Sequence, residues 1–156
     1  MSKLCILAGR PGTGKTEYLN SLKSKSKGSF LIISATDYSS HEDLVRHLYD
    51  LVQDEDCKCI AIDNYEETLI KRWNGIIRDD EYRKVLSILA GFSDNYDISV
   101  YVVVGLKREA DKNGTEYFSK ENLRSAVITE VADSIEFVKN GHDVLCLKTM
   151  KAESSS

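Results

Sequence analysis

Eight residues near the N-terminus have the types and spacing that bind a phosphate chain. They are Gly9, Arg10, Pro11, Gly12, Thr13, Gly14, Lys15 and Thr16. Gly12 and Gly14 let the backbone adopt positive φ and approach an anion without an intervening Cβ. The loop N–H groups converge on phosphate oxygens, while Lys15 can reach the β- and γ-phosphates and the Thr16 hydroxyl can bind Mg²⁺. The segment therefore predicts a site for a nucleoside triphosphate, ATP or GTP, with Mg²⁺.

A phosphate loop of this kind needs a second acid to hold the water shell of the metal, and Asp63 is the candidate. It directly follows the apolar run 59–62, which reads as a buried strand. Ligands of open α/β sheets bind at the carboxyl ends of the strands. We therefore expect Thr16 to bind Mg²⁺ directly and Asp63 to bind it through water.

Strands and helices alternate around these residues. Apolar and β-branched runs predict strands at 4–8, 30–33, 59–62, 100–104, 134–138 and 144–149. Periodicity predicts helices at 16–24, after Ser39 or Ser40, at 65–77, from Asp79 onward with Val85, Leu86, Ile88 and Leu89 buried, and at 119–129. The pattern indicates an α/β fold with a mainly parallel sheet, helices on both faces and a C-terminal β-hairpin at Asn140-Gly141.

Composition restricts the class of protein. The 156 residues carry a net charge of −4, with 42% hydrophobic and 29% charged residues, as expected for one soluble domain. We expect this domain to span residues 1–150, with a disordered tail at 151–156. No apolar run approaches the roughly 20 residues that a membrane span needs, and nothing indicates export, so we expect a cytoplasmic protein without membrane contact. The four cysteines are interpreted as buried thiols rather than zinc ligands.

Several segments, taken in order, resemble the RecA-type ATPase core of replicative hexameric DNA helicases of the DnaB-like family. The matching segments are 7–16, 30–34, 43–48, 60–65, 102–108, 122–125 and 132–135. The resemblance implies a RecA-like P-loop NTPase fold, ATP and Mg²⁺ as ligands, and ATP hydrolysis. It also implies a homo-oligomeric ring that acts on single-stranded DNA or with another replication protein.

Some catalytic positions differ from the family pattern. The slot of the family's catalytic Glu holds Thr36, with Asp37 beside it, and its sensor Gln falls on Gly105. In its Lys-x-Arg finger, which reaches a neighbouring subunit's nucleotide, Lys148 matches the Lys but Met150 occupies the Arg position. The resemblance therefore implies a weak ATPase. Its catalytic candidates are Lys15, Asp37, Asp63 and Lys148.

Three functions are compatible with the sequence. The first is a weak ATPase in DNA replication or recombination, with Glu66 and Glu67 as further candidates for the carboxylate that orients water. The second is a non-hydrolysing nucleotide-binding module that docks on a replication partner. The third is a small-molecule P-loop kinase, which the terminal hairpin disfavours, as does the scarcity of lid arginines, for which only Arg108 and Arg124 are near the right place. A GTPase is disfavoured because the sequence has no Asn-Lys-x-Asp motif.

Overall fold

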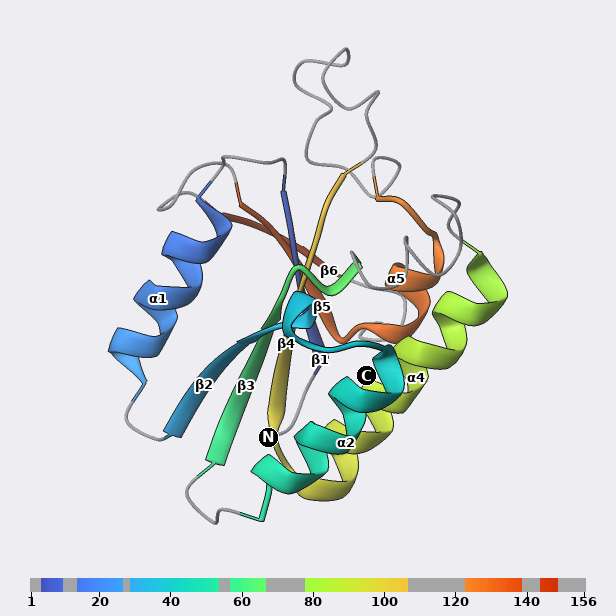
Figure 1. Ribbon diagram of the computed structural model, residues 1–156. Coiled ribbons are helices and arrows are strands. Elements are labelled where there is room, and N and C mark those ends of the chain that lie inside the picture. The colour runs from blue at the N-terminus through green and yellow to red at the C-terminus, as the bar shows by residue number, and fades with distance from the viewer. Residues whose placement is uncertain are drawn as a thin grey trace.

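A six-stranded sheet forms the centre of the molecule (Figure 1). The computed structural model describes residues 4–9, 14–26, 29–53, 57–66, 78–106, 123–138 and 144–148. Its strands are β1 (Leu4–Ala8), β2 (Ser29–Ser34), β3 (Cys57–Asp63), β4 (Ser99–Val104), β5 (Ser134–Val138) and β6 (Val144–Lys148). Strands β2, β3, β4, β1 and β5 are parallel in that order, and β6 is antiparallel to β5 at the edge. The predicted α/β fold with a C-terminal antiparallel pair is confirmed, although the turn at 139–143 lies outside the described residues.

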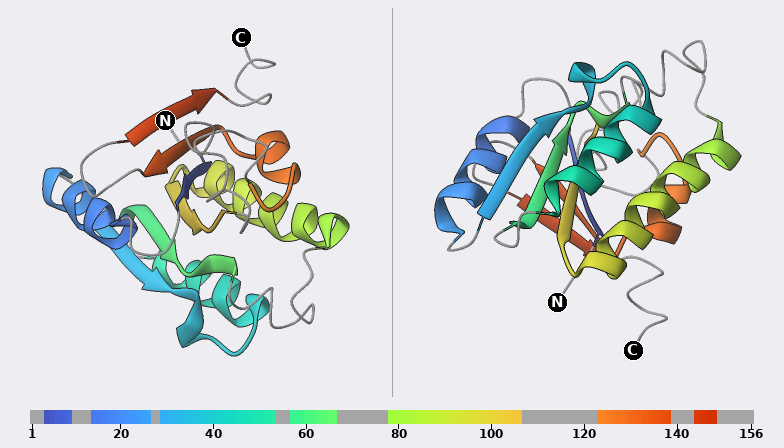
Figure 2. Two further views of the ribbon diagram at one scale, coloured as in Figure 1. Left: turned by 90° about the horizontal axis from the view of Figure 1, so that it is seen from above. Right: turned by 60° about the horizontal axis from the view of Figure 1, so that its bottom comes forward.

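Helices cover both faces of the sheet (Figure 2). Helix α1 (Lys15–Lys25) lies on one face, and α2 (His41–Leu51), α4 (Asp79–Tyr96) and α5 (Val127–Val131) lie on the other. Successive side chains of a strand point to opposite faces. Accordingly Leu4 and Ile6 of β1 pack with α2, α4 and α5, whereas Cys5 and Leu7 pack with α1. All of β1 is buried, which explains why its sequence is continuously apolar instead of alternating.

Two details of the predicted helices need correction or refinement. Ser40, rather than Ser39, is the N-cap of α2, because its hydroxyl accepts a hydrogen bond of 3.2 Å from the Asp43 N–H. Ile88 was predicted to be buried, and this was wrong, since 45% of it is exposed. The buried face of α4 instead passes through Val85, Leu86 and Leu89. Of the helix predicted at 65–77, residues 67–77 lie outside the described residues.

The helix predicted at 119–129 begins later than expected. Residues 119–122 are outside the described residues, and Leu123 forms an isolated antiparallel bridge with Leu106, just after β4. The Ser125 hydroxyl accepts a hydrogen bond from the Val127 N–H at 3.2 Å, at the start of α5. Serine competes for backbone hydrogen bonds in this way, and therefore favours the start of a helix over its interior.

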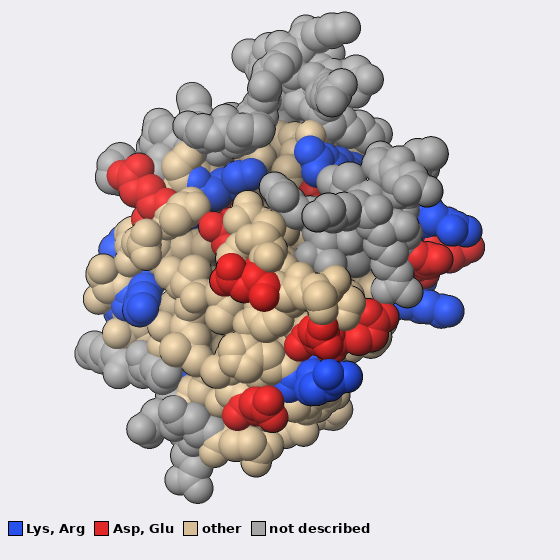
Figure 3. All heavy atoms as spheres, viewed as in Figure 1, with Lys and Arg blue, Asp and Glu red and all other residues tan. Residues whose placement is uncertain are grey.

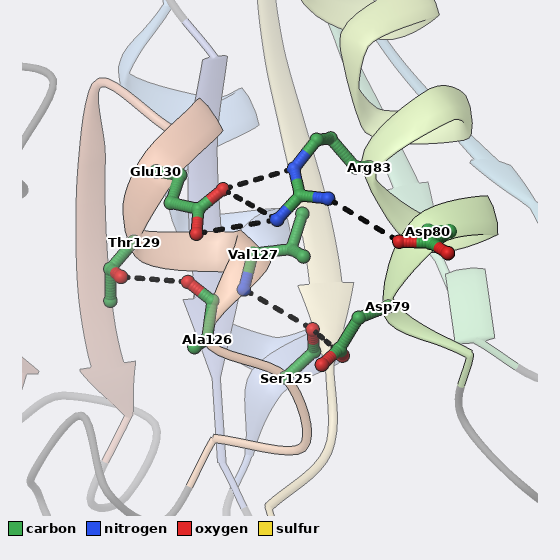
Figure 4. Close-up of polar contacts among 8 residues, drawn as sticks. All are labelled: Asp79, Asp80, Arg83, Ser125, Ala126, Val127, Thr129 and Glu130. Atoms are coloured by element: carbon green, nitrogen blue, oxygen red, sulfur yellow. Dashed lines mark hydrogen bonds and ion pairs between the residues drawn. The ribbon is translucent and has the colours of Figure 1, made fainter.

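Helix α5 is attached to α4 by polar contacts (Figure 4). The Ser125 hydroxyl donates to Asp79 Oδ1 at 2.7 Å, and Ser125 is only 4% exposed. Arg83 of α4 lies between Glu130 of α5 and Asp80, with an Nη2–Oε2 distance of 3.0 Å to Glu130. Exposed ion pairs of this kind contribute about 0–1 kcal/mol each. The bond of the buried Ser125 therefore fixes the segment before α5 more firmly than the Arg83 contacts do.

Two further observations concern the helices and the cysteines among the described residues. None of the described helices has the length and apolar character needed to cross a lipid bilayer. Cys5, Cys57 and Cys59 are buried thiols, as predicted for small core residues. Burial raises the pKa of the Cys59 thiol to about 12, so this thiol is held in its neutral form.

Candidate functional site

A cavity of about 580 Å³ lies at the carboxyl ends of β3 and β4, beside the start of α1. Its walls come from the first residues of α1, the end of β3 with the turn after it, the end of β4, and the segment before α5. Parallel strands bring their carboxyl ends to the same edge, so residues far apart in sequence meet there. The volume lies within the range of about 300–1,000 Å³ that is usual for small-molecule sites.

Lys15 is the first residue of α1 and lines this cavity. Gly14 before it adopts a left-handed conformation with φ 83°, which residues with a Cβ rarely adopt. Lys15 Nζ donates to the carbonyl oxygens of Gly9 at 2.7 Å and Val104 at 3.4 Å. Burial lowers the pKa of the Lys15 ammonium, and Arg124 lowers it further, while Asp63 and Glu66 oppose the shift. A partly desolvated ammonium at a helix N-terminus is an arrangement that attracts an anion.

The predicted metal ligands, Thr16 and Asp63, lie in direct contact. Thr16 Oγ1 donates to Asp63 Oδ2 at 3.0 Å, and the Asn64 N–H donates to Asp63 Oδ1 at 2.9 Å. Asn64 has a φ of 55°, and its side-chain amide donates to Ser34 Oγ at 3.1 Å, across the β2–β3 pair. Asp63 is thereby held with one carboxylate oxygen facing Thr16. A hydroxyl and a carboxylate are oxygen ligands that fit Mg²⁺, which keeps several waters when it binds to protein.

Glu66 and Arg124 form an ion pair in the wall of the cavity. Glu66 is 3% exposed, and its Oε1 accepts hydrogen bonds from the Gly105 N–H at 2.9 Å and from Arg124 Nη1 at 3.0 Å. Its Oε2 accepts a hydrogen bond from the Tyr82 hydroxyl at 2.8 Å. Burial raises the pKa of the Glu66 carboxyl, although Arg124, Gly105 and Tyr82 each act in the opposite direction. The carboxylate is therefore held in a fixed position inside the cavity.

The residues predicted for the site fall into three groups. The first group lines the cavity and comprises Gly14, Lys15, Thr16 and Asp63. Gly9 accepts a hydrogen bond from Lys15. The second group is formed by residues 10–13 of the predicted phosphate loop, which lie outside the described residues.

The structure places the third group, Asp37 and Lys148, apart from this cavity. Asp37 ends the short 3₁₀ helix η1 (Ala35–Asp37) and is exposed, and it does not line the cavity. Lys148 ends β6 in register with Ser134, and Ser134 pairs with Cys5 near the start of β1. Since the cavity is at the opposite, carboxyl edge of the parallel strands, Lys148 lies away from the cavity of its own chain.

Sequence reasoning did not identify Arg124 as a site residue. Arg124 is 19 positions beyond Gly105 in the chain, yet both line the cavity. The Leu106–Leu123 bridge brings them together, and nothing in the sequence marks these two leucines as partners. Two signals were available, namely the position of Arg124 within the segment 122–125, which resembles the helicase family, and its place as one of two possible lid arginines of a kinase.

Most of the chain matches the sequence model of one protein family. The sequence model of the ATPase family associated with various cellular activities (AAA) matches residues 5–134. An "ATPase-like fidgetin" of Schizosaccharomyces pombe is 33% identical over 72 residues, which are 43% of this chain and 11% of that protein. The chain therefore spans only about a tenth of the length of this curated relative.

A solved structure shows the same fold. A KaiC-like protein from the hyperthermophilic archaeon Pyrococcus horikoshii OT3 superposes with a TM-score of 0.62 over 96% of this chain and 80% of the other. The two sequences are 13% identical, so the similarity concerns the fold alone.

The contact between Thr16 and Asp63 leads to a test of the metal site. We expect Asp63→Ala to weaken ATP binding at least about tenfold in Mg²⁺, because the lost carboxylate holds the metal's water shell. Binding in EDTA should change much less. Isothermal titration calorimetry in both buffers measures this, with Asp94→Ala, an exposed acid on α4, as the control. Equal losses in Mg²⁺ and EDTA would contradict the assignment.

Proposed function

This chain belongs to the ATPase family associated with various cellular activities (AAA), and on that premise we propose that it binds ATP with Mg²⁺ and hydrolyses it slowly. One observation carries the proposal, namely the Thr16–Asp63 hydrogen bond of 3.0 Å in the same cavity as Lys15. A phosphate-binding lysine, a hydroxyl and an acid meet there in the arrangement that a triphosphate with Mg²⁺ needs. The family match and the shared fold with the KaiC-like protein support the same proposal.

Each of these residues has a defined part in holding the nucleotide. Lys15 contributes a positive charge whose present partners are two neutral carbonyl groups, so a phosphate oxygen is a stronger acceptor than either. The N–H groups at the start of α1 supply further donors. Thr16 and Asp63 are the residues that would hold Mg²⁺. When bound, the metal neutralises negative charge on the phosphate oxygens.

We propose Glu66 as the residue that orients the attacking water. It lines the cavity, whereas the sequence-based candidate Asp37 is exposed and outside the lining. Glu66 accepts three hydrogen bonds, and burial raises its pKa, so its carboxylate is less available to a water molecule than a free one. Turnover well below the roughly 1–100 s⁻¹ of phosphoryl-transfer enzymes such as kinases is the expected result.

A role in DNA replication or recombination is a second proposal, based on the sequence likeness to DnaB-like helicases. It is supported by the backbone position of Lys148 at the sheet end opposite the cavity, which is compatible with a contact to another subunit's nucleotide rather than to that of its own chain. The face that carries α2 and α4 has acidic and basic side chains interspersed (Figure 3). No broad cationic area is therefore seen among the described residues of that face. Residues 107–122 are not among the described residues.

One measurement separates the ATPase, the docking module and the kinase. ATP turnover is measured with and without single-stranded DNA, together with the mass in solution. Turnover that DNA stimulates, in an oligomer, supports the replication role. Tight ATP binding without turnover supports the docking module, and phosphate transfer to an added small molecule supports the kinase.

The nucleotide-binding proposal is tested most directly at Lys15. We expect Lys15→Ala to weaken ATP binding by more than about tenfold, because a charge-assisted bond to phosphate contributes about 1.5–3 kcal/mol. Calorimetric titration with ATP and Mg²⁺ measures the loss. Lys23→Ala, which removes an exposed lysine from the same helix, is the matched control. Unchanged ATP affinity in Lys15→Ala would refute the proposal.

The assignment of Glu66 is tested by comparing two carboxylates. Steady-state phosphate release at saturating ATP should fall at least about tenfold in Glu66→Gln, since positioned acid–base groups contribute about 10²–10⁴-fold. Asp37→Ala should retain the wild-type rate, because its carboxylate lies outside the cavity. The reverse result would return the catalytic role to Asp37.

A further inference from the structure

Some N–H donors of Arg124 have no acceptor among the described residues. Its Nε donates to the Leu106 carbonyl at 3.3 Å and its Nη1 to Glu66 at 3.0 Å. Nη2 makes no hydrogen bond to any residue within the described part of the chain. The side chain lines the cavity and is 33% exposed, so these donors are open to a ligand there. A guanidinium has five N–H donors in a planar fork that suits the oxygens of a phosphate.

The charged side chains that line the cavity also favour the binding of an anion. Lys15 and Arg124 are two cations that line the same cavity. Two cations that repel each other in a partly desolvated space are stabilised by an anion placed between them. Asp63 faces Thr16 and Glu66 faces Arg124, while the nearest acceptors of Lys15 are neutral carbonyls.

The position of Arg124 is fixed by its neighbours in the chain. Leu123 is tied to Leu106 by the antiparallel bridge, and Ser125 is hydrogen-bonded to Asp79 of α4 at 2.7 Å (Figure 4). Both neighbours are buried, with exposures of 2% and 4%. The backbone of Arg124 is therefore held on both sides, while its long side chain keeps the freedom to change partner.

Gly105 provides the space that the guanidinium occupies. A Cβ built on Gly105 would lie 2.9 Å from Arg124 Nη2, closer than such contacts allow. The Gly105 N–H remains bonded to Glu66 Oε1, so the glycine serves both members of the ion pair. Any side chain at position 105 would move the guanidinium from its present place.

We propose that Arg124 exchanges Glu66 for the terminal phosphate of a bound nucleoside triphosphate, and so sets the preference of the site for a triphosphate over a diphosphate. The exchange is feasible because Glu66 keeps the Gly105 N–H and the Tyr82 hydroxyl when Arg124 leaves it. This inference rests on the proposed function, since it assumes that Lys15 and the start of α1 bind the other phosphates.

The test compares two nucleotides that differ by the terminal phosphate. Dissociation constants of ADP and of a non-hydrolysable ATP analogue are measured in Mg²⁺ by calorimetry, for the wild type, Arg124→Gln and Glu66→Gln. The ratio of the two constants is the readout, because damage to the fold would weaken both nucleotides alike. In Arg124→Gln we expect the preference for the ATP analogue to fall by about tenfold or more, as for the loss of a charge-assisted bond.

Glu66→Gln should change the ratio in the opposite direction. It removes the carboxylate that competes for Arg124, so affinity for the ATP analogue should rise more than affinity for ADP, and the preference for the ATP analogue should increase. This variant keeps the inference testable if Arg124→Gln does not fold. A ratio within about twofold of wild type in either folded variant would overturn the role of Arg124.

Failure of this inference can be told apart from failure of the proposed function. If the wild type binds neither nucleotide, or if Lys15→Ala binds both as the wild type does, the proposed function is wrong. If the wild type binds both and Lys15→Ala loses both, an unchanged ratio in Arg124→Gln refutes only the inference about Arg124.

Discussion

A carboxylate that is buried away from water needs hydrogen-bond donors, and the buried carboxylate of this site is Glu66. Removing one partner of a buried ion pair destabilises a protein by about 3–5 kcal/mol, because the other charge is left unpaired. The three donors to Glu66 come from the backbone after β4, from α4 and from the segment before α5. One buried group thus ties together three parts of the chain that the sheet alone would not connect. The wall of the cavity depends on this network as much as on the strands.

The order of the strands explains why the residues proposed to bind phosphate meet the acid. Strand β4 lies between β1 and β3, and all three are parallel. The loop after β1 and the Asp63 that ends β3 therefore reach the same edge on either side of β4. Helix α1 begins at that edge, which places Thr16 within 3.0 Å of Asp63 although they are 47 positions apart. The geometry follows from the parallel topology and from short connections at the carboxyl edge.

Residues whose role depends on local pattern could be predicted from the sequence, and residues whose role depends on distant contacts could not. The meeting of Lys15, Thr16 and Asp63 and the strand before the loop were predictable because each carries its own signal of spacing or apolar run, whereas residues 10–13 lie outside the described residues. Ile88 was wrongly predicted to be buried. Its spacing from the other three apolar residues fits a broad buried face of α4, whereas the face that is buried is narrower and excludes it. Arg124 was missed because its place is determined by the Leu106–Leu123 bridge, for which no periodicity exists. The helix predicted at 119–129 was too early since its apolar spacing does not reveal that Ser125 bonds to Asp79.

The Glu66–Arg124 pair also connects the proposed preference for a triphosphate with the proposed slow turnover. Arg124 is the leading influence that lowers the pKa of Glu66 against the effect of burial. If Arg124 turns to a phosphate, that influence weakens, and the pKa of the buried carboxyl rises further. A carboxyl with a raised pKa spends more time protonated, and in that form it cannot accept a proton or a hydrogen bond from water at the same oxygen. The contact that would favour a triphosphate thus makes Glu66 a poorer base. On these two proposals the site would hold ATP better than it consumes it, which accords with the slow turnover proposed for a chain whose Asp37 lies outside the cavity.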